Sequence, residues 1–405
     1  MDKKWIRIIL GLIILKPIFD LDWRWPLFYI GSIAIPFHRI VAFIVPIILT
    51  VILLLKLFSS HKIKTNNSIF AILVLIWVTC SFLLNLNIYS LDEYFRTYNF
   101  FIIFLTVPVL LNSKQEFLRA GKVMILISLI PTIFSYLQVL GIFPFSYWDY
   151  LPVIGRVGRV SGGYRHPTGY LNYLVTLFPL LVYLFVNKAI SKGFFWLWIF
   201  LTLPMVGCSF HRATIIVVLL QIFVFIFLMR RGLIKYFAIL FFIFTMVIFF
   251  KPIWSLINQG GAITQLKFRG RTRSENAAWP KYSKYFIKFQ FYRQLIGFGS
   301  PKLPDGSYDP HSDWLRITFN YGWIGLIFYT LFLITSAFIF LFKLLRQKIS
   351  SWINSPALIG LVLIITIVLY SITMEPLRYS SFSWFCALVL GYVYREVKSA
   401  VIVKI

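Results

Sequence analysis

The residue best suited to chemistry in this sequence is His311, which stands between two carboxylates in the stretch Asp309-Pro-His-Ser-Asp313. A neutral imidazole, which ordinarily titrates near pH 6.5, can accept a proton from an attacking hydroxyl group. A neighbouring carboxylate can orient the ring for that purpose. The pattern therefore indicates a general base oriented by Asp309 or Asp313. On residue type alone, a loop histidine that is merely hydrogen-bonded near a membrane surface remains the commoner case.

The same segment offers a second kind of site. Carboxylates and an imidazole that lie close together in sequence can bind a hard cation, and here the available ligands are Asp305, Asp309, His311 and Asp313. The run lacks the glycine and the closing glutamate of an EF-hand loop. The three cysteines lie in or beside apolar runs without a Cys-x-x-Cys spacing, which gives no zinc site. We therefore expect neither a metal nor a cofactor.

Arginines beside apolar runs predict a site for phosphate. They are Arg159 and Arg165 around a Gly-Gly pair, Arg212 at the start of an apolar run, and Arg271 and Arg273 in a long polar segment. The planar guanidinium group suits phosphate oxygens better than ammonium does. Attraction to anionic lipid headgroups, about 1 kcal/mol per cation, explains any single one of these arginines equally well. Three clusters on one face of a membrane instead favour a diphosphate site.

Two other polar residues accompany arginines. His166 follows Arg165 in Tyr-Arg-His-Pro, and Glu375 lies three residues before Arg378. Structural hydrogen bonding is the simplest role for His166, although it is a second candidate for chemistry. We expect Glu375 to pair with an arginine and hold it in place.

The elements that must position these residues are membrane helices. The chain has 405 residues, of which 60% are hydrophobic, and apolar runs of nearly 20 residues recur along it. Such a run can cross a hydrocarbon core of about 30 Å as a helix. The composition excludes an ordinary soluble domain and predicts an all-α polytopic protein with one integral membrane domain, 1–405. Twelve spans are expected: 6–20, 36–58, 68–88, 97–112, 120–141, 168–187, 194–209, 212–229, 233–250, 316–343, 355–374 and 380–395.

The net charge of +27 is explained in part by the enrichment of lysine and arginine in the cytoplasmic connections of membrane proteins. With the N-terminus inside, each inner connection carries at least two lysines or arginines, so both termini are expected to be cytoplasmic. The remaining cations concentrate in 142–167 and 251–315 on the outer side. Segment 251–315 is then a large outward loop between spans 9 and 10, and long loops are often functional. The charge is therefore no argument for a nucleic-acid partner.

The loop 251–315 contains a predicted amphipathic helix. Its aromatic and basic side chains recur at three- and four-residue spacing on separate faces: Trp279, Tyr282, Phe286, Phe289 and Tyr292 or Arg293 on one, Lys281, Lys284 and Lys288 on another. Pro280 suits the first turn. The helix either lies in the outer interface of the membrane, with its rings among acyl chains, or packs on the bundle with a solvated lysine face.

Three motifs occur in order along the chain. They are Arg159-x-x-Gly-Gly-Tyr-Arg-His-Pro-Thr-Gly before one span, Cys208-Ser-Phe-His-Arg-Ala-Thr at the start of another, and Ile296-Gly-Phe-Gly299 followed by His311-Ser and Gly322-x-x-Gly325. Their order, the number of spans and the large outward loop resemble the O-antigen ligase and polymerase superfamily. The resemblance is strongest over 156–325. It departs from the family at Phe210-His211, where a small or polar residue often precedes the arginine, and the run of arginines at 269–273 leaves the register of the loop arginine open.

The resemblance implies a fold similar to the class C glycosyltransferases. The donor would be a glycan linked to undecaprenyl diphosphate, used on the outer face of the bacterial cytoplasmic membrane in a metal-independent, inverting transfer. His311 would activate the acceptor hydroxyl. The leaving diphosphate would be held by Arg212 with Arg271 or Arg273, and less directly by Arg159 and Arg165. Partners in such a pathway would include a flippase and a regulator of chain length.

Three functions remain open from the sequence. The first is a polymerase of a surface polysaccharide (O-antigen, capsule or exopolysaccharide), which we favour because nothing marks a lipid A-core acceptor. The second is a ligase that moves finished glycan onto a lipid or wall acceptor. The third is a transporter or flippase, which predicts internal repeats and ionisable residues deep within spans. The sequence shows no clear repeat, and its charges stand almost entirely at span ends.

Overall fold

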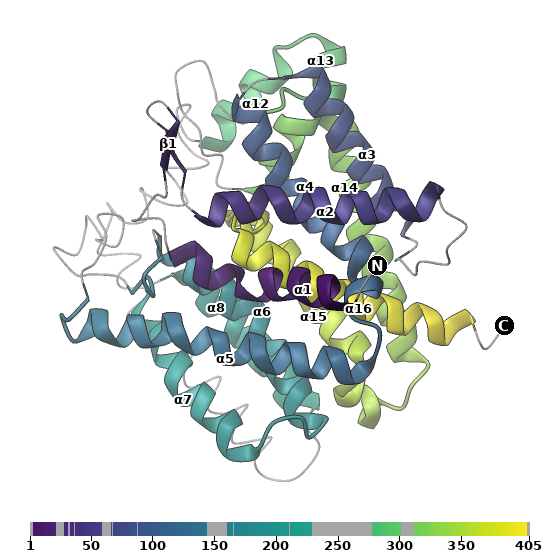
Figure 1. The fold of residues 1–405 in the computed structure, drawn as a ribbon. Coiled ribbons are helices and arrows are strands. Elements are labelled where there is room, and N and C mark those ends of the chain that lie inside the picture. The colour runs from purple at the N-terminus through teal and green to yellow at the C-terminus, as the bar shows by residue number, and fades with distance from the viewer. Residues whose placement is uncertain are drawn as a thin grey trace.

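A computed structural model shows that the described part of the chain is helical almost throughout (Figure 1). It describes residues 3–21, 28–30, 33–35, 37–58, 66, 68–86, 88–143, 160–164, 166–209, 211–228, 278–300 and 312–402. Within these residues, one short antiparallel hairpin, β1 (Phe28–Ile30) and β2 (Ile33–Ile35), interrupts the helices. The prediction of an all-α fold is confirmed in this coarse sense.

Helices stand where the apolar runs predict spans. They are α1 (Lys3–Phe19), α2 (Phe37–Phe58), α3 (Ile69–Leu84), α4 (Ile88–Leu110), α5 (Lys114–Val139), α6 (Pro167–Val186), α7 (Lys192–Cys208), α8 (Arg212–Leu228), α14 (Asp313–Leu345), α15 (Pro356–Thr373) and α16 (Ser380–Ile402). The predicted span 233–250 lies outside the described residues. The largest difference at the start of a helix is in α4, which begins at Ile88 rather than at 97. Its charged first turns interrupt the apolar pattern but remain helical.

Four of the described helices are long and apolar enough to cross a membrane, judged by length and composition: Phe37–Leu55, Lys114–Val139, Thr168–Val186 and Asp313–Leu345. Shorter apolar helices accompany them at Ile69–Leu84, Lys192–Cys208, Ala213–Leu228 and Pro356–Ile372. Apolar helices of this kind are typical of a protein embedded in a membrane.

The centre of the bundle is formed by α4, α6 and α16. Residues 97–108, 168–184 and 381–394 are buried on every side rather than along one stripe, which is the pattern of an enclosed helix. In Figure 1, α1 and α16 run side by side through the middle, and the two helices are in contact. At Gly391 of α16 an added Cβ would lie 2.8 Å from Phe104 O of α4, so glycine permits this close approach.

Prolines inside the helices remove backbone N–H groups, and side chains from other parts of the chain compensate for three of them. A proline leaves the carbonyl four residues earlier without its helical donor. A side-chain amide donates to each of these carbonyls instead: Asn99 Nδ2 to Ala42 O before Pro46 (3.2 Å), Asn66 Nδ2 to Phe104 O before Pro108 (2.7 Å), and Gln221 Nε2 to Val175 O before Pro179 (3.1 Å). Unpaired backbone groups are costly in hydrocarbon, so these contacts allow proline in the bundle.

The amide–proline contacts can be tested at Asn99. We expect Asn99→Leu to lower the free energy of unfolding by about 1–3 kcal/mol, because Ala42 O then has no donor. In a Pro46→Ala background, alanine restores the missing N–H, and the same substitution should cost less. Thermal unfolding of the four proteins in detergent gives this double-mutant cycle. An equal cost in both backgrounds would contradict the explanation.

Candidate functional site

The first turns of α14 hold a fully buried arginine. The Nε of Arg316 donates to Asp313 Oδ1 at 2.8 Å, and its Nη1 donates to Glu93 Oε2 of α4 at 2.8 Å. Both carboxylate side chains are also fully buried. A buried charge is tolerated when it is paired and hydrogen-bonded. The three residues therefore act as one unit that fixes the start of α14 to α4.

Further charges extend this unit into a larger network. Within the described residues, three arginines and four carboxylates take part: Arg96 with Asp92 (2.6 Å) and Glu93, Arg316 with Glu93 and Asp313, and Arg378 with Glu375 (2.8 Å). Arg378 ends the short 3₁₀ helix η5 (Pro376–Arg378), and its positive charge also acts on Glu93. We call these seven residues the α14 charge network. Since its acids outnumber its arginines, the network by itself does not attract a diphosphate.

Glu93 lies in the part of α4 that precedes the predicted span 97–112. Burial by itself would raise the pKa of its carboxyl group. The positive charges of Arg96, Arg316 and Arg378 outweigh this effect and lower the pKa to about 2. The carboxyl group is therefore ionised at neutral pH. The contact between Glu93 and Arg316 is a true ion pair rather than a neutral hydrogen bond.

Backbone contacts tie the same turn of α14 to the end of α15. Asp313 Oδ2 accepts from the Leu377 N–H at 3.0 Å, and the Asp313 N–H donates to Met374 O at 3.0 Å. The buried Ser312 hydroxyl donates to Ser371 O at 2.9 Å. Ser312 is the sequence neighbour of His311, so the chain on the C-terminal side of that histidine is firmly fixed.

Several predicted site residues cannot be placed in this arrangement. Those that lie outside the described part of the structure are His311, Arg159, Arg165, Arg271, Arg273 and the possible ligands Asp305 and Asp309. Arg212 is the first residue of α8, and its side chain is likewise outside the described part. Among the side chains that are described, no three His, Cys, Asp or Glu residues are grouped so as to hold a metal ion.

The supporting residues do have positions. Glu375 pairs with Arg378 through Oε2, as predicted. His166 is the N-cap of α6, where its Nδ1 accepts from the Thr168 N–H at 3.2 Å, which confirms a structural hydrogen bond for this histidine. Both oxygens of Asp313 already have partners, since Oδ1 accepts from Arg316 and Oδ2 accepts from the Leu377 N–H. Whether Asp313 also orients His311 stays a prediction.

The two glycine motifs of the sequence meet in space. Gly322 interrupts α14 with φ 66° and ψ −172°, a conformation that essentially only glycine adopts. A Cβ there would lie 2.1 Å from Leu295 O, and one on Gly297 would lie 2.3 Å from Asn320 O. The two backbones touch because neither position carries a side chain.

The carbonyls released by the break in α14 find new donors. The Phe298 N–H donates to Phe319 O at 2.9 Å, and the Gly299 N–H donates to Asn320 O at 2.8 Å. Trp77 Nε1 of α3 donates to Tyr321 O at 2.8 Å. Broken helices persist in membranes where such donors exist. The break thus docks the segment 297–299 immediately beside the α14 charge network, whose Glu93 also accepts from Asn320 Nδ2 at 3.1 Å.

The predicted amphipathic helix forms and packs on the bundle. It is α12 (Ala278–Ile287), which buries Tyr282 and Phe286 against Phe319 of α14, while Lys284 faces outward. Of the two predicted arrangements, the structure shows packing on the bundle. The aromatic pattern predicted a longer helix, but α12 ends at Ile287 and a separate helix, α13 (Phe291–Ile296), follows. Both lie at the end of the molecule near α3 and α14 in Figure 1.

We expect Gly322→Ala to destabilise the protein by at least about 2 kcal/mol, because the residue would be strained at its φ and its Cβ would meet Leu295 O. Gly193→Ala is the matched control, since a Cβ at that helical position meets nothing within 4 Å. It should be neutral or slightly stabilising. Denaturant unfolding in detergent measures both, and an equal response of the two variants would argue against the strain.

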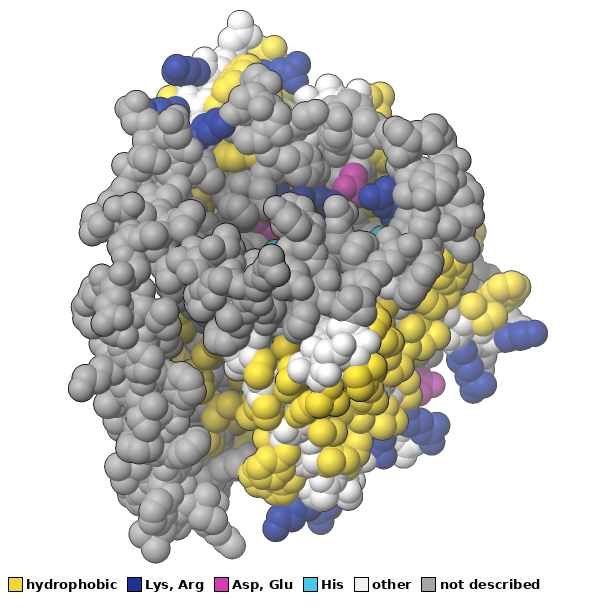
Figure 2. Space-filling view, turned by 90° about the vertical axis from the view of Figure 1, so that its left-hand side faces the viewer, with side chains coloured by type: hydrophobic (Ala, Val, Ile, Leu, Met, Phe, Trp, Pro, Cys, Tyr) yellow, Lys and Arg dark blue, Asp and Glu magenta, His cyan; other side chains and the backbone are white. Residues whose placement is uncertain are grey.

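Figure 2 shows one face of the molecule on which acidic, basic and histidine side chains of described residues are seen together, apart from a large area of apolar side chains. The charged groups of the α14 charge network that the sequence did not single out are Asp92, Glu93, Arg96 and Arg316. Their local signals were present as Asp92-x-x-x-Arg96 and Asp313-x-x-Arg316, spacings that place opposite charges on one helix face. Nothing in either spacing indicates that the two pairs meet.

The chain was also compared with known proteins. No protein-family model matches it, and no curated protein matches it.

Proposed function

We propose that this chain is a membrane glycosyltransferase that polymerises a surface polysaccharide, namely O-antigen, capsule or exopolysaccharide. The observation that carries the proposal is the α14 charge network, which fixes Asp313 and Arg316 directly after the segment of His311. A general base contributes to catalysis only when it is held within reach of the reacting hydroxyl. A helix start that is fixed by buried ion pairs supports such positioning.

The proposed reaction needs one proton acceptor and a set of cations. The acceptor sugar oxygen forms a bond to the anomeric carbon of the donor, and its proton passes to His311. The bond between that carbon and the diphosphate oxygen breaks, and undecaprenyl diphosphate leaves with the electron pair. Attack from the opposite face inverts the anomeric centre.

The cations of this proposal are not members of the α14 charge network. Because the network has no positive surplus, neutralisation of the leaving group is assigned to Arg212 and to Arg271 or Arg273, with Arg159 and Arg165 in support. Guanidinium groups suit phosphate oxygens, and charge developing on a leaving group is stabilised most strongly where water is excluded. The proposed transfer therefore uses no metal.

The proposed topology has twelve spans with both termini in the cytoplasm and the site on the outer face of the bacterial cytoplasmic membrane. The start of α1 and the end of α16 lie toward the same side of the bundle in Figure 1, as an even number of spans requires. The positive-inside pattern supplies the orientation. The loop 251–315 would then be extracytoplasmic and would carry α12 and α13.

Deletion of the gene followed by sizing of the surface glycan tests this function. A polymerase is expected to leave single repeats on the acceptor, and the wild-type gene should restore the ladder of lengths. Long polymer stranded on undecaprenyl diphosphate would instead identify a ligase. Lipid-linked repeats retained on the cytoplasmic side would identify a flippase, and unchanged glycan would exclude all three roles.

A further inference from the structure

A second polar site lies at the other end of α14. This helix has 33 residues, so a straight helix of this length would measure about 50 Å, enough to reach from one headgroup layer of a bilayer to the other. An open cavity of about 360 Å³ lies between the end of α14, the short 3₁₀ helix η4 (Ile349–Asn354), the start of α15 and α16. Its volume is in the range of small-molecule sites.

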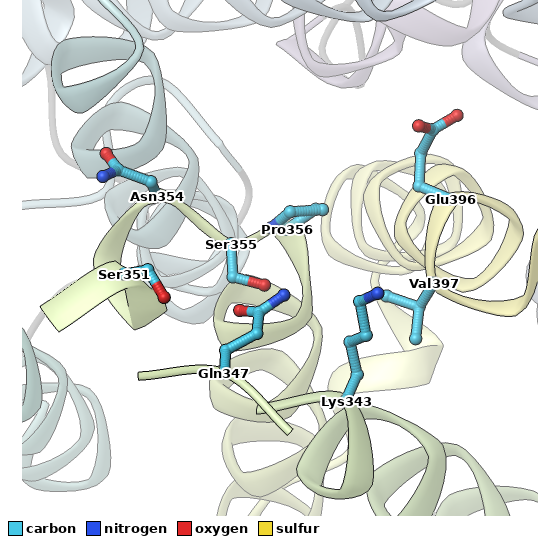
Figure 3. A pocket seen from close by; sticks show the side chains of 8 residues that line it. All are labelled: Lys343, Gln347, Ser351, Asn354, Ser355, Pro356, Glu396 and Val397. Atoms are coloured by element: carbon cyan, nitrogen blue, oxygen red, sulfur yellow. The ribbon is translucent and has the colours of Figure 1, made fainter. Parts of the chain in front are cut away.

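Polar side chains converge on this cavity, but some of their polar atoms form no hydrogen bonds with one another. Ser355 is 4% exposed, and neither its Oγ nor Gln347 Oε1 has a hydrogen-bond partner in the described part of the chain. Figure 3 shows both side chains and Lys343 directed into the same space. Buried polar atoms are normally paired, so unpaired ones in the lining of a cavity mark a place where a ligand with polar groups can bind.

The charges around the cavity favour an anion. Lys343 forms no salt bridge with any described residue. Glu396, the acidic residue of the lining, pairs with Arg395 at 2.7 Å, and the Glu396 carboxylate points away from Ser355 in Figure 3. Ser355 is also the N-cap of α15, but its side chain makes no capping hydrogen bond. The positive end of the helix dipole and the uncommitted hydroxyl therefore face the same space as the ammonium group.

The surroundings indicate where the anion comes from. Large apolar side chains stand exposed at this end of the chain's α14–η4 segment, among them Leu345 at 64% and Ile349 at 60%, and Phe338 lies exposed earlier in α14 at 66%. In a membrane these surfaces contact acyl chains. A phosphate group with acyl chains attached would thus suit both the polar cavity and the apolar outer surface of the same helix end, which free phosphate would not.

We propose that this cavity binds the headgroup of a glycerophospholipid. Lys343 and the Ser355 hydroxyl contact the phosphodiester at the start of α15, and Gln347 pairs with the polar group beyond it. This site is separate from the proposed glycosyl transfer, since it lies at the opposite end of α14. It anchors the α14–α15 connection to one leaflet.

The test uses the purified full chain in detergent, stripped of lipid, with binding followed by native mass spectrometry. The probes are dioleoylphosphatidylglycerol, dioleoylglycerol as the same lipid without phosphate, and inorganic phosphate. We expect saturable binding of the phospholipid alone. Lys343→Met and Ser355→Ala should each weaken it about tenfold, because each removes one hydrogen bond to a charged group. Ser355→Ala spares the fold, since no capping bond is lost.

Lys348→Met is the matched control, because Lys348 is an exposed cation near this end of α14 that does not line the cavity. It should change binding less than twofold. Equal weakening in all three variants would show general attraction to the surface and overturn the proposal. Dioleoylglycerol binding as tightly as the phospholipid, or inorganic phosphate displacing the phospholipid at similar concentration, would overturn it too.

Discussion

Under the proposed function, replacing His311 by alanine is expected to reduce polysaccharide polymerisation about 10²–10⁴-fold, the usual contribution of a general base. The acceptor hydroxyl would then have no group to take its proton as the new bond forms. The substitution leaves in place the contacts of Asp313 and Arg316 that fix the start of α14. We therefore expect the variant protein to accumulate in the membrane at the normal level.

The measurement is the length distribution of the surface glycan in a deletion strain that carries each variant, with the membrane protein quantified in parallel. His61→Ala is the control, because His61 lies in a connection predicted to face the cytoplasm. It should restore normal polymer. Undiminished polymer in the His311→Ala strain, at a normal protein level, would rule out a general-base role for this residue.

Arg316→Met is expected to lower the free energy of unfolding by about 3–5 kcal/mol, the usual cost of removing one partner from a buried ion pair. Methionine fills much of the space of the arginine stem but leaves the buried carboxylates of Glu93 and Asp313 without their shared cation. These carboxylates then repel each other in a poorly hydrated site. The start of α14 should loosen from α4.

Combined substitutions separate lost charge pairing from lost packing. The triple variant Glu93→Gln, Asp313→Asn, Arg316→Met carries no charge at these positions and should be more stable than Arg316→Met alone. Arg346→Met, at an exposed position at the other end of α14, should change stability by less than about 1 kcal/mol. Thermal unfolding in detergent compares the proteins. An Arg316 variant as stable as the Arg346 variant would contradict the structural role of the network.

The helices were largely predictable because each apolar run carries its own signal. A run such as 168–187 is long, uncharged and bounded by polar residues, and α6 occupies nearly the same residues. The start of α4 was missed for the same reason, since Asp92, Glu93 and Arg96 interrupt the apolar pattern on which the prediction depends. Hydropathy reports lipid contact and burial, whereas this turn is stabilised by ion pairs.

The candidate site was predictable only where its contacts are local. The pairing of Glu375 with Arg378 and the cap formed by His166 span three residues or fewer. The contact of Glu93 with Arg316 joins residues 223 positions apart, and no spacing rule connects them. Likewise, the glycine motifs were visible in sequence, but the contact of Gly297 with Gly322 depends on how α13 docks on α14.

The amide–proline contacts have a consequence for the order in which the protein is made. The hydrogen-bond donors to Ala42 O and Val175 O are Asn99 and Gln221, and each donor is on a helix that is synthesised after its acceptor. Phe104 O, by contrast, accepts a hydrogen bond from Asn66, which has already been synthesised. The helices α2 and α6 thus each enter the bilayer with one backbone carbonyl that has no hydrogen-bond donor until a later helix is inserted. Biosynthesis of this bundle is coupled across helices, and pausing or truncation between the members of a pair should leave an intermediate that quality-control proteases recognise.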